Sequence, residues 1–218
     1  YVEKNKINKI NFIQNKSLEL SLFLSLPATF ALLISSEQIT SALFGYGSFD
    51  KTSVKNSAEA LFYFAFGLPA FALIKVFSSF LFARHNTKIP FIFSLISVIL
   101  NIAISLYFFN EIGFIIIPIA TTISSWLNAL ILFIYLINKN YFEFNKVFFS
   151  SFFKISFTVF VTMYVFYYLI DFFEKYLNFD SSFKLVTIIL IVLVIFIFYI
   201  LLSLLTKAFK ISDIKLKY

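Results

Sequence analysis

Two basic side chains lie in or beside an apolar stretch, where a charge is costly and therefore informative. Lys75 precedes Arg84 by nine residues in the stretch 58–83, which is about 13 Å along a helix. A lysine at that depth either extends back to the lipid headgroups or faces a water-filled cavity that receives an anion. Arg84 opens the basic turn 84–88, which either sets membrane topology or meets a phosphate at headgroup level. Both residues are candidates for binding an anionic ligand.

Two later apolar stretches each carry polar side chains on one face. Residues three or four apart share a helix face, and the polar residues follow that spacing: Ser94, Ser97, Asn101 and Ser105 in 89–109, and Thr121, Ser125 and Asn128 in 112–137. These stripes are either a packing seam with interhelical hydrogen bonds or part of a transport pathway. On the second interpretation, the candidate substrate-binding residues are Asn101, Thr121, Ser125 and Asn128.

The residue types that catalysis requires are missing. The chain has no cysteine, one histidine (His85) and four glycines. No two carboxylates share a spanning stretch, no serine lies near a histidine base, and no glycine-rich phosphate loop occurs. The absence of cysteine excludes a disulfide framework and thiolate chemistry. We predict a protein that is not an enzyme and that carries no cofactor.

Composition assigns the chain to a membrane. Of its 218 residues, 61% are apolar and 13% are charged, and the mean hydropathy is +0.92. A soluble domain has about 25% charged residues, so a soluble enzyme, a disordered tail and a secreted disulfide scaffold are excluded. Stretches that approach or exceed the roughly 20 residues of a spanning helix are 18–35, 58–83, 89–109, 112–137, 147–170 and 185–205. They are too long for barrel strands and do not alternate. The predicted fold is all-α, a polytopic membrane protein with six transmembrane helices.

Basic residues predict the orientation of these helices. With the N-terminus in the cytoplasm, the outer connections hold only four lysines, which are Lys51, Lys55, Lys175 and Lys184. Most acidic residues fall on that outer side. We therefore expect both ends of the segment to be cytoplasmic. Topology explains the net charge of +7, so no nucleic-acid partner is expected.

Candidate helix kinks lie at Pro27, Gly67, Pro69 and Pro118.

Three segments, in order, carry a family pattern. They are Leu26, Pro27 and Ala28 followed by ITSALFGYGSF at 39–49; the residues from Gly67 through Lys75 to Pro90; and 113–129, with the run ATTISSWLNA. Together they resemble the MurJ/MviN lipid II flippase family of the MOP superfamily. Asn86 stands where an Asp is usual in that family, and Ile89 stands where a Thr is usual. The last two stretches match in hydrophobicity and placement alone.

This resemblance implies a C-terminal lobe, about helices nine to fourteen of a fourteen-helix MOP-type transporter whose N-terminal lobe is missing. The expected divisions are a cytoplasmic loop at 1–17 after missing upstream helices, a four-helix part at 18–137, two last helices with a lipid-tail groove at 138–207, and a cytoplasmic tail at 208–218. The implied protein is a multi-pass transporter of the bacterial inner membrane. It moves lipid II, an undecaprenyl-pyrophosphate-linked glycopeptide, by alternating access for peptidoglycan and cell wall synthesis. Its implied partners are lipid II, membrane lipids and the missing lobe.

Single residues carry over from the same resemblance. Lys75 matches a family lysine and is the first candidate for a cavity cation. Some members bind sodium with an Asn and an acid one turn apart plus a Thr on the next helix. Asn101 and Thr121 match, but Ser105 stands at the acid position, and a hard cation prefers carboxylate oxygen. Two alternatives stay open: another MOP-type exporter, such as a polysaccharide or O-antigen flippase, and a six-span structural subunit without transport of its own.

Overall fold

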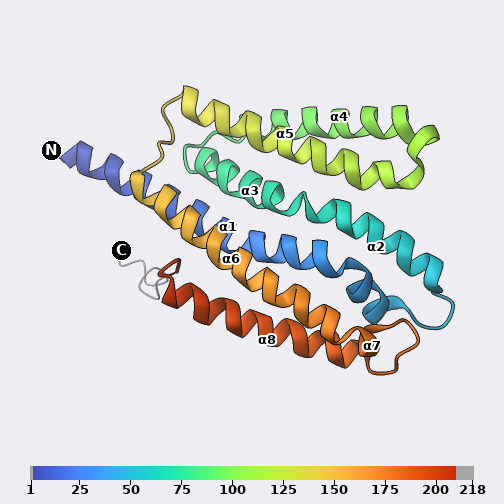
Figure 1. Ribbon diagram of the computed structural model, residues 1–218. Coiled ribbons are helices and arrows are strands. Elements are labelled where there is room, and N and C mark those ends of the chain that lie inside the picture. Colours follow the sequence, from blue (N-terminus) through green and yellow to red (C-terminus); the bar gives the residue numbers. More distant parts are fainter. Residues whose placement is uncertain (1, 210–218) are drawn as a thin grey trace. The chain divides into compact units, whose positions relative to one another are not determined.

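The computed structural model describes residues 2–209, with side chains from Asn8 onward. Its elements are helices throughout this range (Figure 1): α1 (Val2–Phe44), α2 (Lys51–Ala65), α3 (Leu68–Phe82), α4 (Lys88–Ile112), the 3-10 turn η1 (Gly113–Ile115), α5 (Ile116–Asn138), α6 (Lys146–Phe172), α7 (Glu174–Leu177) and α8 (Lys184–Leu205). The all-α prediction is confirmed. The expected tail at 208–218 lies outside the described residues beyond Phe209.

Four apolar segments are long enough to cross a membrane, and the broken pair α2 and α3 adds a fifth. The four are Asn8–Phe44, Lys88–Asn138, Lys146–Phe172 and Lys184–Leu205. The 51-residue segment Lys88–Asn138 consists of α4, with 25 residues, and α5, with 23, which pack together as a hairpin (Figure 1). Five of the six stretches predicted from the sequence therefore lie on helix, and the sixth, 58–83, is divided between α2 and α3.

The chain divides into two compact units, each made of two separate stretches. Unit 1 comprises the residues up to Ser25 together with Tyr63–Phe149, and unit 2 comprises Leu26–Phe62 together with the residues from Ser150. Helices α1, α2 and α6 therefore contribute to both units. The parts expected from the sequence, divided at residue 138, are contiguous, whereas each of these units combines two separate stretches. An apolar pattern along the chain does not say which helices pack together.

Unit 1 is built around α5, which packs against α4 and α3. Ala120 and Ala129 of α5 are almost completely buried, and such small residues let neighbouring helices approach closely. Phenylalanines fill the space at one end of the unit. The ring of Phe142 lies 6.0 Å from that of Phe80 and 4.8 Å from that of Phe144, between ring centroids. Phe80 and Phe142 therefore belong to the core of this unit, whereas Phe144 covers them at the surface.

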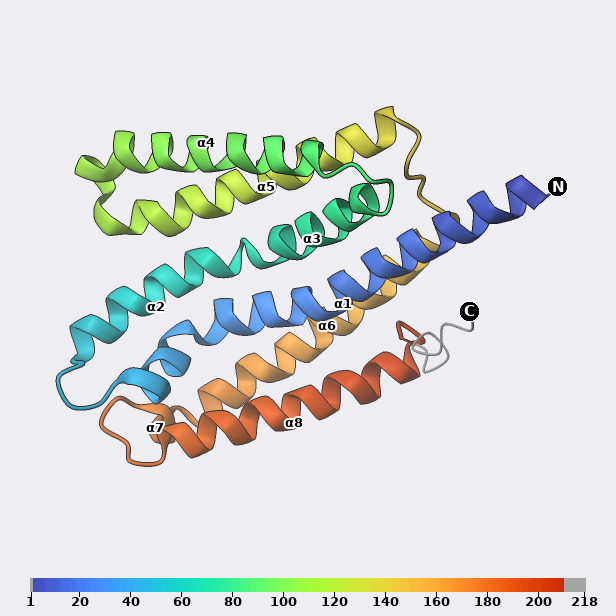
Figure 2. The same ribbon diagram turned by 180° about the vertical axis from the view of Figure 1, so that it is seen from behind.

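Unit 2 contains α6 and α8, which run side by side in both views (Figures 1 and 2). One narrow seam of α8 is buried, formed by Lys184, Ile188, Ile191, Ile195, Tyr199 and Ser203, whereas most of its other residues are apolar and at least partly exposed. Helices that are apolar all round belong in a membrane.

Asp50 precedes α2 and accepts a hydrogen bond from the backbone N–H of Ser53 at 2.8 Å. This bond is the main reason why the pKa of Asp50 lies below its ordinary value.

Helix α1 corrects two expectations. Residues 1–17 were expected to form a loop, but α1 is helical from Val2, because these residues contain neither Pro nor Gly and include several lysines, which favour helix. Pro27 lies inside the helix, yet the non-helical backbone is at Ser35, with φ −129° and ψ 26°. The kinks predicted at Gly67 and Pro69 are confirmed, since α2 ends at Ala65 and α3 begins at Leu68.

Candidate functional site

The break between α2 and α3 is held by side chains of α5. Helix α2 ends at Ala65 and α3 begins at Leu68, with Pro69 in its first turn, so backbone carbonyls around the break lose their helical donors. Thr122 Oγ1 donates to the carbonyl oxygen of Tyr63 at 2.8 Å, and Trp126 Nε1 donates to that of Phe66 at 2.9 Å. Broken membrane helices are tolerated where a neighbouring helix supplies such bonds.

Gly67 is needed for this close contact. A Cβ atom there would lie 3.0 Å from the ring of Phe71 and 3.1 Å from Thr122 Oγ1. Neither Thr122 nor Trp126 is a candidate from the sequence. In the sequence, the closely spaced Gly67 and Pro69 indicate a helix break, and a break leaves backbone carbonyls without helical donors. The sequence does not show which helix donates hydrogen bonds to them instead.

Lys75 lies on α3, about two turns after the break. Its side chain is exposed, whereas Phe77 and Leu81 on other faces of α3 are buried. Among the described residues, Lys75 has no hydrogen-bond or ion-pair partner. The ammonium group is therefore available to an anion, as either interpretation of Lys75 requires.

Arg84 is fixed by backbone carbonyls just after α3. Its Nη1 donates to the carbonyl oxygen of Phe80, and its Nη2 donates to that of Tyr141, both at 2.8 Å. The guanidinium also lies 4.7 Å from the centroid of the Tyr141 ring. Gln14 of α1 donates to the same Tyr141 carbonyl at 3.1 Å. Arg84 thus positions the connection before α6, and a guanidinium has five N–H donors in all, so donors remain for a ligand.

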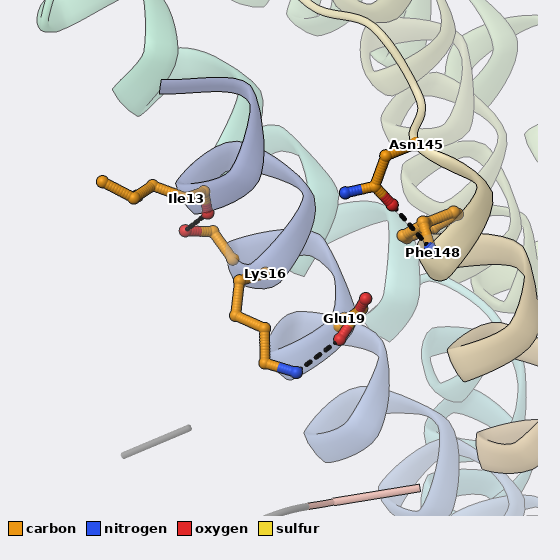
Figure 3. A network of polar contacts seen from close by, with 6 residues as sticks. Ile13, Lys16, Glu19, Asn145 and Phe148 are labelled. Carbon is orange, nitrogen blue, oxygen red and sulfur yellow. Dashed lines mark hydrogen bonds and ion pairs between the residues drawn. The ribbon is translucent and has the colours of Figure 1, made fainter. Parts of the chain in front are cut away.

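A polar junction joins α1 to the start of α6 within unit 1, and Figure 3 shows one of its bonds, between Asn145 and Phe148. Asn15, which is 1% exposed, donates to the carbonyl of Glu143 at 2.8 Å and accepts from the N–H of Asn145 at 3.2 Å. Asn145 in turn accepts from the N–H of Phe148 at 2.7 Å and so caps α6. Figure 3 also shows Lys16 paired with the buried Glu19 on α1, at 2.6 Å. The sequence analysis did not identify this junction.

The two polar stripes face each other across α4 and α5. Ser97 Oγ donates to the carbonyl of Ser124 at 3.0 Å. Asn101 Nδ2 donates to Thr121 Oγ1 at 2.8 Å, and Asn128 Nδ2 lies 3.5 Å from Ser94 Oγ. The structure therefore brings Asn101, Thr121 and Asn128 together in a hydrogen-bonded seam. Ser125 is buried and donates to the carbonyl of Thr121 on its own helix, at 2.7 Å.

These residues do not fit a bound sodium ion. Thr121 Oγ1 donates to the carbonyl of Ile117 at 2.8 Å while it accepts from Asn101. Ser105 Oγ has no hydrogen-bond partner, but a hydroxyl does not replace a carboxylate for a hard cation. Glu111 is the one acidic residue within α4 and α5. In the described part of the chain, no three His, Cys, Asp or Glu residues form a group that could hold a metal ion.

In unit 2, Lys184 is buried at the start of α8, with 2% of its surface exposed. Its Nζ donates to the carbonyl oxygens of Gly45 and Phe179, each at 2.7 Å. It also lies 4.3 Å from the ring centroid of Tyr46 and 4.5 Å from that of Phe179. The sequence analysis counted Lys184 among the charges of a connection. Its burial depends on contacts with residues far away in the chain, which the sequence does not show.

Known proteins of one family match this chain. A family model described as "Lipid II flippase MurJ" matches residues 1–188. The chain belongs to the MurJ lipid II flippase family. The resemblance drawn from its three sequence segments is therefore confirmed.

Individual MurJ proteins match over part of their length. The chain is 42% identical over 127 residues to "Probable lipid II flippase MurJ" of Rhizobium meliloti (strain 1021), covering 58% of this chain and 24% of that protein. It is 37% identical over 133 residues to the protein of the same name from Rickettsia prowazekii (strain Madrid E), covering 61% and 26%. The chain thus spans about a quarter of the length of these relatives.

A solved MurJ structure shares the fold. The structure titled "Lipid II flippase MurJ, inward closed conformation" superposes with a TM-score of 0.71 at 26% identity. The match covers 91% of this chain and 40% of that chain. The prediction of a helical, MOP-type transporter lobe is therefore confirmed at the level of fold.

Within this MurJ family member, the predicted site residues differ in their surroundings. Lys75 is exposed and has no partner within the described part of the chain, Arg84 is bound to backbone, and the polar residues of α4 and α5 bond one another. The residues that the sequence analysis missed, such as Asn15 and Lys184, bind carbonyls of distant segments.

Proposed function

We propose that the chain forms part of a lipid II flippase, which carries an undecaprenyl-pyrophosphate-linked glycopeptide across the bacterial inner membrane for peptidoglycan synthesis. The observation that carries this proposal is the MurJ family match over residues 1–188. Because the chain spans about a quarter of its curated relatives, transport belongs to a longer protein. The remainder of that protein, an N-terminal lobe, is the partner of this segment.

In this proposal Lys75 binds the pyrophosphate, or an acidic residue of the other lobe. The support is its exposed ammonium on α3, which pairs with none of the residues that the structure describes. A charge in an apolar segment normally faces a partner or a water-filled cavity. Arg84 keeps the base of α3 attached to the connection at Tyr141, so that the position of Lys75 is defined.

We propose that the hydrogen-bonded seam between α4 and α5 keeps these two helices rigid relative to each other. Asn101, Thr121, Ser125 and Asn128 bond within or across the two helices, and such bonds hold membrane helices together. The pair then moves as one body during alternating access. This assignment develops the packing interpretation of the stripes, and the same residues stay candidates for contact with substrate.

The lipid tail requires an apolar surface. A groove of about 520 Å³ lies in unit 2 between the end of α6 and α8, and its lining is almost entirely apolar, including Leu169, Phe173, Leu190 and Val194. An undecaprenyl chain is a branched hydrocarbon, so burial against such side chains is favourable. The groove supports the tail site predicted within residues 138–207.

The proposed orientation keeps both ends of the segment cytoplasmic, in a multi-pass protein of the inner membrane. The support is the basic turn containing Arg84 and Lys88 and the basic connection containing Lys139 and Lys146, which the positive-inside rule places in the cytoplasm.

Survival of cells depleted of their lipid II flippase tests the function. The full-length gene that contains this segment should restore growth. A protein that reaches the membrane at normal levels without restoring growth would reject lipid II transport. If the gene instead restores O-antigen or exopolysaccharide export in a mutant that lacks the exporter for that polysaccharide, the protein is another MOP-type exporter. If it restores neither growth nor export, the protein is a structural subunit.

A further inference from the structure

Unit 2 contains a second, polar cavity of about 770 Å³, lined by the last turns of α1, the start of α2 and the segment that precedes α8. Its lining includes Glu37, Ser41, Lys51, Glu174 and Lys175. Its volume lies in the range of ligand sites, which is about 300–1,000 Å³. The transport steps proposed above do not use this cavity.

We propose that this cavity binds the peptide part of the lipid-linked substrate, a peptide that carries both an ammonium and a carboxylate group. The assignment to that substrate rests on the proposed function. The binding of such a peptide is argued from the cavity itself.

Both signs of charge are available in the lining. Glu37 and Glu174 form no ion pair with any described residue, and neither does Lys175. The other lysine of the lining, Lys51, is bound to Asp180 at 2.8 Å. The open carboxylates fit an ammonium group, and the open ammonium fits a carboxylate. A neutral sugar would leave these charges unused.

Ser41 provides an independent sign of a ligand. It lines the cavity, is 4% exposed, and its Oγ has no hydrogen-bond partner. Buried hydroxyl groups are nearly always bonded, because an unmade bond costs free energy. A hydroxyl both donates and accepts, so a peptide amide or carbonyl entering the cavity would satisfy it.

The walls are held in place before a ligand enters. Lys184 bonds the carbonyls of Gly45 and Phe179, and Phe179 is itself part of the lining. The end of α1 and the segment before α8 are thereby fixed to each other. A preformed site loses less entropy on binding than a flexible one.

The polar cavity adjoins the apolar groove between α6 and α8. Tyr176 and Phe183 line both of them. A ligand that joins a hydrocarbon tail to a charged peptide therefore meets an apolar and a polar surface side by side. In the proposed orientation this end of unit 2 faces outward, which is the side of release.

Peptide binding to the purified full-length transporter in lipid nanodiscs tests the inference. The probe is a water-soluble pentapeptide with one side-chain amine and a free C-terminal carboxylate, measured by calorimetry. We expect the double variant Glu37→Gln, Glu174→Gln to weaken binding by about fivefold to tenfold, as exposed charge pairs do. Acetylation of the amine should weaken binding to the wild type similarly and have little further effect on the double variant. Glu111→Gln, an exposed acid outside the cavity, is the matched control and should bind as the wild type does.

No binding to the wild type, or equal binding by the double variant at unchanged thermal stability, would overturn the inference. Ser41→Ala provides a second variant that removes no charge, and it should also weaken binding. The growth test separates this inference from the proposed function. If the gene restores growth but the peptide does not bind, only the cavity assignment fails. If the peptide binds but growth is not restored, the cavity remains a peptide site and the lipid II assignment fails.

Discussion

Lys184 Nζ lies 2.7 Å from the carbonyl oxygen of Gly45, so the first residue of α8 holds the end of α1. A cation at a helix N-terminus opposes the helix dipole, and burial adds a desolvation cost. The carbonyls of Gly45 and Phe179 and two aromatic rings offset these costs. A Cβ atom on Gly45 would lie 3.2 Å from Nζ and 2.6 Å from the carbonyl oxygen of Ser41, which explains the glycine.

Replacing this lysine should destabilise unit 2. Lys184→Met keeps the length of the side chain but leaves two carbonyls without a donor, at a cost of about 1–3 kcal/mol for each unsatisfied group. Thermal unfolding of the full-length protein in detergent should show a lowered midpoint. Lys175→Met, at an exposed position, is the control and should unfold as the wild type does. Equal unfolding midpoints for both variants would contradict a stabilising role of the bonds from Lys184 to Gly45 and Phe179.

Sodium should not stabilise this chain. Asn101 and Thr121, which the sequence resemblance matches to sodium ligands of some family members, bond each other, and Ser105 supplies no carboxylate. We expect the same unfolding midpoint in NaCl and KCl at equal ionic strength. Ser105→Asp places an acid one turn from Asn101 and should make the midpoint rise in NaCl alone. A sodium-specific rise in the wild type would show that the seam binds the ion.

The orientation can be tested by single cysteines, because residues 1–218 contain none. In a full-length protein freed of other cysteines, Thr87→Cys, between α3 and α4, should react only with a membrane-permeant thiol reagent. Ser181→Cys, before α8, should react with an impermeant reagent added from outside. The opposite pattern would reverse the proposed topology, and impermeant labelling of both would reject the membrane arrangement.

The charge of Lys75 should matter for transport. Lys75→Ala removes the exposed ammonium of α3. It should weaken substrate binding by about tenfold or more and so slow the rescue of growth. Lys75→Arg keeps the charge and should retain most of the rescue. Lys154→Ala, an exposed lysine of α6, is the matched control. Full rescue by Lys75→Ala would reject the cavity-cation role and leave the family assignment intact.

The sequence predicts those parts of the fold that local patterns determine. The apolar stretches predict the helices, Gly67 and Pro69 predict the break before Leu68, and the spacing of Asn101 and Thr121 predicts that each lies on a polar face. These features depend on residues within a few turns of each other.

Long-range partners were not predictable in this way. Asn15 bonds the backbone of Glu143, and Lys184 bonds that of Gly45. A backbone carbonyl carries no sequence signal, because every residue has one. The division into two units was missed for the same reason, since it depends on which apolar faces meet.

The most direct test of the account is the movement of lipid II itself. Cells depleted of their own flippase and expressing the full-length gene are treated from outside with an enzyme that cleaves lipid II, and the cleaved product is measured. The gene should restore cleavage, and Lys75→Ala should lower it while Lys154→Ala should not. Lipid II that stays protected from the enzyme, with the transporter present in the membrane at normal levels, would contradict the account.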